Sequence, residues 1–166
     1  MGGFVALPLI ILGALVQATW ASRLRLLGVT PDVVLVLVIG WAVVRGLREG
    51  LLIALVGGLT MEALTGAPLG MTTAALVLAT WLASVAESNV FRSAWYLPYV
   101  SIAIATPVYY GTMLLFMRLA GRPLPWMTML GRVVVPSVTL NLLLMPAVYA
   151  ACRWLHRGIG PEVVEW

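Results

Sequence analysis

The sequence contains no lysine and very little charge of either sign. Only 10% of its 166 residues are charged, whereas a soluble domain carries about 25%. Hydrophobic residues make up 62% of the chain, and the mean hydropathy is +1.04. The net charge of +4 comes from arginines at the ends of apolar segments. That placement favours lipid headgroups over nucleic acid as their partner. We therefore expect an integral membrane protein.

Cysteine and histidine each occur once, which excludes several kinds of chemistry. Cys152 cannot form a disulfide within the chain. His156 alone cannot provide the spaced ligands of a metal motif. The sequence also lacks a G-x-S-x-G nucleophile motif and paired carboxylates within one apolar segment. We therefore expect no enzyme activity, no catalytic residue, no metal and no cofactor.

Six apolar segments follow one another with short polar breaks between them. A membrane-spanning helix needs about 20 apolar residues, so six of them fill most of the chain. The expected helices cover residues 4–21, 32–47, 50–64, 71–86, 98–118 and 133–155. The second is short, and Arg45 is expected to extend it by snorkelling toward the membrane surface. The pattern predicts an all-α, six-transmembrane-helix bundle as a single domain over residues 1–166, with both termini on one side.

The arginines do not orient this bundle. Basic residues mark the cytoplasmic side of a membrane protein. One side would receive Arg45, Arg48, Arg92, Arg153 and Arg157, and the other Arg23, Arg25, Arg118, Arg122 and Arg132. Because the ten arginines divide equally, their distribution leaves the orientation open.

Glu62 lies inside the third apolar segment, where a carboxylate is unfavourable. A charge at the centre of a membrane helix costs ~2.5 to 3.5 kcal/mol on insertion scales, so it usually faces protein. The following stretch, "TGAPLG", contains Gly66, Pro68 and Gly70 and is typical of a turn. Glu62 then meets the negative end of its own helix dipole. We favour a hydrogen bond to the backbone of this turn, with partner contact and proton or ion transport as alternatives.

Small residues recur every four positions in the same segment. Gly50, Ala54 and Gly58 precede Glu62, and small residues let helices approach closely in lipid. The row drifts by about 40° at each step, so it predicts an inclined groove that suits a crossing helix. That helix belongs either to this chain or to a partner protein. Both alternatives remain open at this point.

Three further polar residues lie in or beside apolar segments. Asp32 precedes the second segment and is expected to cap its helix by accepting bonds from free backbone N–H groups. Gln17 and Asn141 lie within segments and are expected to hydrogen-bond between helices. An ion carrier would need a second buried titratable group besides Glu62, and the sequence indicates none.

Several stretches together resemble the MreD family of rod-shape-determining membrane proteins. "GGLTMEALTGAPLGMTTAALVLATWLAS" is similar to the family's central signature, in which an acidic residue precedes an "-L-SG-PLG-" turn. "TPDVVLVLVIGWAVVRGLREG" and "LNLLLMPAVYAACRWLHR" resemble its second and last helices. The likeness extends from about Gln17 to Arg157. The family more often has aspartate at the position of Glu62, which keeps the charge and shortens its reach.

The resemblance implies a six-helix bundle similar to the substrate-binding subunits of energy-coupling-factor vitamin transporters. It also implies a bacterial inner-membrane location, with both termini in the cytoplasm. The implied role is a scaffold of the cell-wall elongation machinery. Its direct partner would be MreC, and its indirect partners would be MreB, RodA and a class B penicillin-binding protein. The alternative is that the chain is itself such a vitamin-binding subunit, with the pair Ala14 and Ala18 contacting the energising partner.

Overall fold

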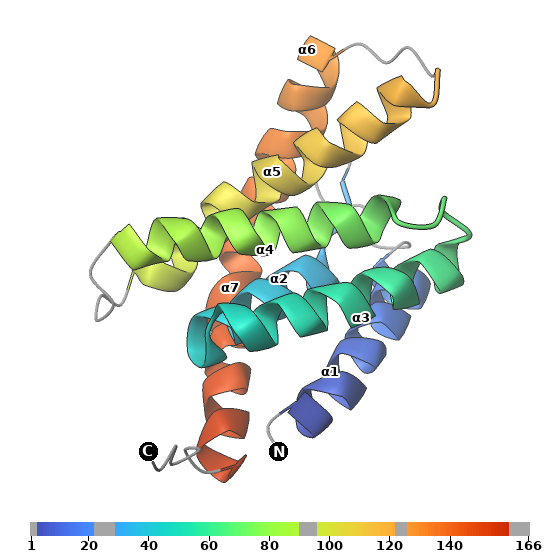
Figure 1. The fold of residues 1–166 in the computed structure, drawn as a ribbon. Coiled ribbons are helices and arrows are strands. Elements are labelled where there is room, and N and C mark those ends of the chain that lie inside the picture. Colours follow the sequence, from blue (N-terminus) through green and yellow to red (C-terminus); the bar gives the residue numbers. More distant parts are fainter. Residues whose placement is uncertain (1–2, 22–28, 90–95, 122–125, 160–166) are drawn as a thin grey trace.

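The computed structural model describes residues 3–21, 29–89, 96–121 and 126–159 (Figure 1). Within these ranges the chain is all-helical and forms six helices. The elements are α1 (Gly3–Val16) continued by the π-helical turn η1 (Gln17–Ala21), α2 (Val33–Arg45), α3 (Leu47–Thr65), α4 (Met71–Asn89), α5 (Leu97–Leu119), and α6 (Trp126–Met129) continued by the π-helical turn η2 (Leu130–Val134) and α7 (Val135–Ile159). Of the arginines used to test orientation, Arg23, Arg25, Arg92 and Arg122 lie outside the described residues.

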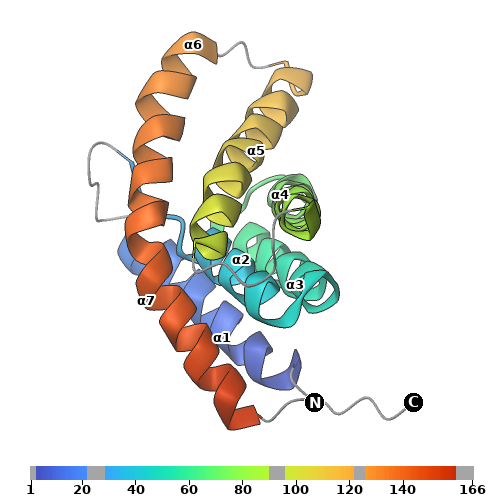
Figure 2. The same cartoon turned by 90° about the vertical axis from the view of Figure 1, so that its left-hand side faces the viewer.

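Helix α2 lies at the centre of the bundle and contacts α1, α3, α4, α5 and α7 (Figures 1 and 2). Every residue from Val34 to Ala42 is buried. The stretch "VVLVLVIGWAVV" has no polar side chain before Arg45, and a helix that is apolar on all sides is stable only when it is covered on all sides. Gly40 faces α7, where an added Cβ would lie in ordinary contact with Val148, at 3.4 Å.

Helices α2 and α3 form a hairpin that turns at the single residue Gly46. Its φ of 91° lies in the left-handed region that favours glycine. Beside the turn, the Trp41 indole N–H donates to Glu49 at 3.1 Å, and Arg45 lies 3.5 Å from the same carboxylate. The Arg45 side chain is only 6% exposed. It therefore turns inward, contrary to the expected snorkelling, and Leu47 begins α3 instead of extending α2.

Helices α3 and α4 lie side by side and run antiparallel, joined by the short loop 66–70 (Figure 1). Helix α5 packs against α4 and also against α7, so it closes the bundle on the side opposite α1. The last helix begins at Trp126, before the expected start at residue 133. The sequence pattern placed a loop at Gly131 and Arg132, whereas the π-helical turn η2 accommodates both residues within a continuous helix.

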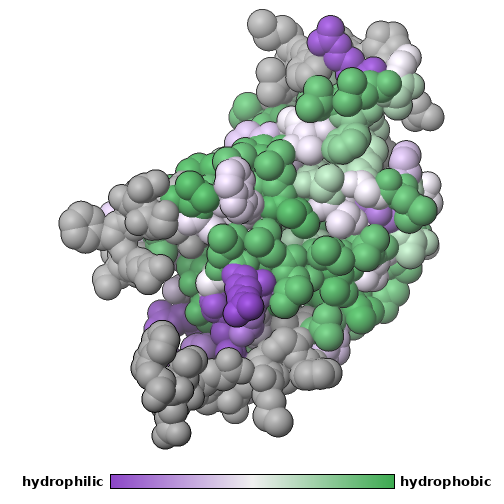
Figure 3. Space-filling model, viewed as in Figure 1, coloured by the Kyte–Doolittle hydropathy of each residue, from purple (hydrophilic) through white to green (hydrophobic). Residues whose placement is uncertain are grey.

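Among the residues that the structure describes, two helices are long and apolar enough to cross a membrane, Leu97–Leu119 and Gly131–Arg157. The apolar helices Leu7–Thr19, Val33–Arg45 and Met71–Val85 are shorter. With 13 residues, α2 rises only about 20 Å, less than the ~30 Å hydrocarbon core of a bilayer. Large apolar side chains are exposed on several helices, including Leu52, Leu119, Leu143 and Trp154, and much of the face in Figure 3 is hydrophobic. These features indicate a helical protein of the membrane type.

Candidate functional site

Asp32 is the centre of a buried hydrogen-bond network that joins distant parts of the chain. Its Oδ1 accepts a bond from the Gln17 side-chain amide at 3.3 Å, and its Oδ2 accepts a bond from the Tyr110 hydroxyl. The Asp32 backbone N–H donates to Oδ1 of Asn141 at 3.2 Å. Three residues that the sequence singled out separately, Gln17, Asp32 and Asn141, therefore meet at one place.

The expected capping role of Asp32 is wrong. Asp32 precedes the first residue of α2, but its carboxylate makes no capping hydrogen bond. Instead, Oε1 of Gln17 accepts a bond from the Val34 backbone N–H at 2.7 Å. The π-helical turn η1 carries Gln17 at this point. The start of α2 is thus capped by a side chain from the first helix, which leaves the Asp32 carboxylate free to bind Gln17 and Tyr110.

Asn141 extends the network to α5. Its Nδ2 donates to the Thr106 hydroxyl at 3.2 Å, and that hydroxyl donates to the Ile102 carbonyl one turn earlier. Asn141 and Thr106 are both fully buried. Thr106 and Tyr110 were not predicted from the sequence. Threonine and tyrosine are common in apolar helices, so neither residue type signals a polar contact by itself.

Glu62 joins the end of α3 to the start of α4. Its two carboxylate oxygens accept bonds from the backbone N–H groups of Gly70, at 2.9 Å, and Thr73, at 2.8 Å. These donors belong to the start of α4, which carries the positive end of that helix dipole. The unfavourable position of Glu62 in its own helix is thereby offset. This geometry matches the favoured expectation, a hydrogen bond to the turn that follows.

The loop 66–70 has a conformation that depends on its glycines. Gly66 ends α3 in the left-handed conformation with φ of 67°, and its N–H donates to the Glu62 carbonyl at 2.9 Å. Gly70 has φ of 88° just before α4. Between them, the Pro68 carbonyl accepts a bond from the Met71 N–H at 3.2 Å. The loop therefore reverses the chain within five residues and brings the α4 N–H groups onto Glu62.

The small-residue row on α3 is filled by this chain's own helices. A Cβ on Gly50 would lie 2.5 Å from the Ala42 Cβ of α2, and one on Gly58 would lie 2.4 Å from the Thr73 Cα of α4. Ala54 is fully buried. No space for a partner helix remains along these three residues, which corrects the partner-groove alternative in favour of internal packing.

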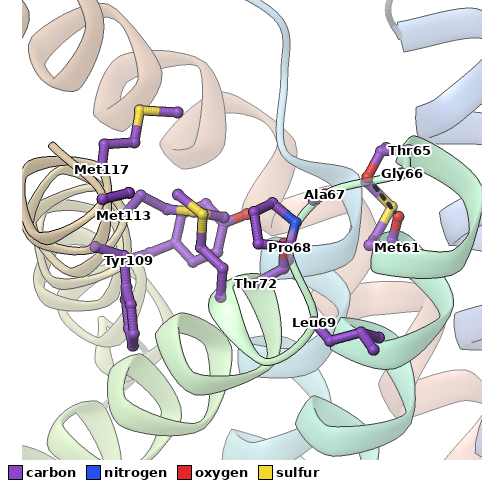
Figure 4. A pocket seen from close by; sticks show the side chains of 13 residues that line it. Met61, Thr65, Gly66, Ala67, Pro68, Leu69, Thr72, Tyr109, Met113 and Met117 are labelled. Carbon is purple, nitrogen blue, oxygen red and sulfur yellow. Dashed lines mark hydrogen bonds between the residues drawn. The ribbon is translucent and has the colours of Figure 1, made fainter. Parts of the chain in front are cut away.

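Two cavities adjoin these polar groups. The larger, of about 790 Å³, lies between the loop 66–70 and the second half of α5 (Figure 4). Tyr109, Met113 and Met117 form its α5 side, and Met61 and Thr65 lie across from them. The smaller cavity, of about 360 Å³, is lined by the same three α5 side chains and by Asp32. Both volumes lie in the range of small-molecule sites, about 300 to 1,000 Å³.

The hydrogen bonds of Asp32 and Glu62 position one helix against another, and Asp32 also lines a cavity. Among the described residues, no group of three or more His, Cys, Asp or Glu side chains is placed to hold a metal ion. Asp32 is 6% exposed and Glu62 is 2% exposed, so the expectation that Glu62 has no second buried titratable group beside it was wrong. Glu62 nevertheless holds a backbone N–H on each oxygen, and this geometry favours a structural role over proton transfer.

Comparison of the chain with family models, with curated proteins and with solved structures finds no match. The function proposed below therefore rests on the sequence motifs and on the geometry of the two carboxylates.

Proposed function

We propose that this chain is a non-enzymatic membrane scaffold of the bacterial cell-wall elongation complex, and that it acts in cell shape maintenance by binding MreC. Through MreC it associates with MreB, with RodA and with a class B penicillin-binding protein. It resides in the inner membrane as a multi-pass bundle with both termini in the cytoplasm. This assignment follows from the resemblance to the MreD family.

The proposal is supported mainly by the hydrogen bonds that the polar residues of the family-like motifs make. Gln17 and Asn141, from the first and last helices, each hydrogen-bond to Asp32 at the start of α2. Glu62 binds the turn that the family signature contains. Each of these polar groups fixes the position of one helix against another, which is what a scaffold requires. Their bonding partners belong to the chain itself, so the motif supports architecture more than turnover.

The proposal is tested by quantitative capture from native membranes. The tagged chain is purified under mild detergent, and MreC is measured by mass spectrometry against a tagged unrelated multi-pass protein expressed at the same level. The capture is repeated with the tag on MreC. We expect strong enrichment of MreC in the first experiment and of this chain in the second. Enrichment no higher than the control in both directions would refute the scaffold role.

A vitamin-binding transporter subunit is the second candidate, and the cavity of about 790 Å³ is the observation that favours it. Such a subunit holds a small ligand within its helices. The cavity of this chain, however, has a mostly apolar lining, with few groups that would hydrogen-bond a vitamin. Native mass spectrometry of the purified chain discriminates the two functions. A vitamin that co-purifies at one per chain, together with absence of MreC, assigns the transporter function.

A further inference from the structure

The smaller cavity combines a buried carboxylate with apolar and aromatic walls. Asp32 is 6% exposed and contributes to the cavity lining. The rings of Tyr109 and Tyr110 line it as well, with their centroids 5.4 Å apart and their planes near perpendicular. Met113 and Met117 form part of the remaining apolar wall. A cavity of this kind presents a single acidic group to whatever enters it.

The Asp32 carboxylate has no cation beside it among the residues that the structure describes. Its hydrogen-bonding partners are the Tyr110 hydroxyl and the side-chain amides of Gln17 and Asn141, and all three are neutral. Each oxygen accepts at least one of these bonds, and a carboxylate has about four acceptor positions in all. A buried charge is normally paired, because its transfer out of water is unfavourable. Arg45, whose side chain is only 6% exposed, lies at the other end of α2, beside Glu49.

We propose that this cavity binds an organic ammonium ion that carries an apolar body. The ammonium group would donate to the Asp32 carboxylate in a charge-assisted hydrogen bond. Aromatic rings attract cations, and two tyrosines line this cavity. The methionines offer an adaptable apolar surface to the rest of the ligand.

Tyr109, Met113 and Met117 line both cavities, so the second cavity lies beside the first along α5. The apolar body of a ligand bound at Asp32 would therefore contact methionines that also line the cavity next to the loop 66–70 (Figure 4). This proposal is independent of the scaffold function, since it concerns Asp32 and α5 and not the capture of MreC.

The test uses the full chain in phosphatidylcholine nanodiscs, with n-octylammonium as the probe and n-octanol as the neutral control of equal chain length. We expect octylammonium to raise the midpoint of thermal unfolding with saturation, and octanol to leave it unchanged. The Asp32→Asn variant loses the carboxylate charge, and its affinity for octylammonium should fall at least about tenfold. Glu49→Gln changes a carboxylate away from the cavity and should keep the full response.

A second pair of variants tests the cavity even if Asp32→Asn fails to fold. Met117→Trp fills the space and should abolish the octylammonium response, whereas Leu115→Trp adds the same group at an exposed position of α5 and should retain it. An equal response to octanol, or an unchanged response in Met117→Trp, overturns the proposal. Absence of any response in the wild-type chain also overturns it, and would return Asp32 to a purely structural role or to pairing with a basic side chain of a protein partner.

Discussion

The two buried carboxylates of this bundle differ in what holds them. Glu62 accepts hydrogen bonds from backbone N–H groups 8 and 11 residues further along the chain. Asp32 is bonded by side chains, and its partners Tyr110 and Asn141 lie 78 and 109 residues away. Glu62 therefore fixes one local turn. Asp32 joins the start of the central helix to α5 and α7, and it also faces a cavity.

The difference separates a structural carboxylate from one that is available to a ligand. Both Glu62 oxygens are engaged by the N-terminus of α4, which is a fixed part of the fold. The Asp32 carboxylate has acceptor positions left over and borders open space. We expect substitutions of Glu62 to act on stability, and those of the Asp32 network to act on both stability and binding.

The largest effect is expected for Glu62→Ala. The substitution leaves the Gly70 and Thr73 N–H groups without an acceptor, and each bond to a charged group contributes about 1.5 to 3 kcal/mol. We predict a loss of about 3 kcal/mol or more, with a clear fall in the thermal unfolding midpoint in detergent. Glu62→Gln retains one acceptor oxygen, so its unfolding midpoint should lie between those of Glu62→Ala and the wild type. If both variants unfold at the wild-type midpoint, Glu62 does not have the structural role given to it here.

Gly58→Leu should cause the second-largest loss of stability. It tests whether the small-residue row on α3 packs against helices of this chain. A Cβ at this position already lies 2.4 Å from the Thr73 backbone, so the two helices must separate. Overpacking of this kind costs about 1 to 3 kcal/mol. The matched control is Ala63→Leu, at an exposed position of the same helix. Normal stability of Gly58→Leu with reduced capture of MreC would restore the partner-groove interpretation.

Asn141→Ala should have a smaller effect, because it leaves one buried backbone donor, the Asp32 N–H, without its acceptor. The Asp32 N–H and the Thr106 hydroxyl each lose one partner, while Thr106 keeps its bond to Ile102. An unsatisfied buried donor costs about 1 to 3 kcal/mol. The midpoint should fall, and exchange of the Asp32 amide hydrogen should accelerate. Unchanged amide exchange would show that Asn141 does not hold the start of α2.

The smallest effect is expected for Gln17→Ala. The variant removes the cap on Val34 and one bond to Asp32, and loss of a helix cap typically costs about 1 kcal/mol. Exchange of the Val34 amide should accelerate while that of Gly70 and Thr73 stays slow. If the Gly70 and Thr73 amides exchange faster by the same factor as Val34, the two carboxylates belong to one cooperative unit. Their roles would then not be separate.

The local features of this fold could be predicted from the sequence. The turn at Gly66 to Gly70 and the bonding of Glu62 to it follow from turn residues placed directly after an acidic residue. Their partners are close in sequence, so no knowledge of the tertiary arrangement is needed. The apolar segments likewise predicted helices at nearly every place where the structure has one.

The long-range features could not be predicted in this way. Asp32 lies where a cap is expected, but the position of Gln17 on the first helix decides which side chain performs that role. Tyr110 carries no distinguishing signal within the apolar α5 segment. The row Gly50, Ala54 and Gly58 indicated close packing without indicating which helix occupies it, and only the positions of α2 and α4 resolve that choice.

The most direct test compares Glu62→Gln with Asp32→Asn, each measured in nanodiscs with and without octylammonium. Our account predicts that Glu62→Gln unfolds at a lower temperature than the wild type yet keeps the full octylammonium response. It predicts that Asp32→Asn loses less stability and also loses that response. The reverse pattern, or the same response in both variants, would contradict the division between a structural carboxylate and a binding one.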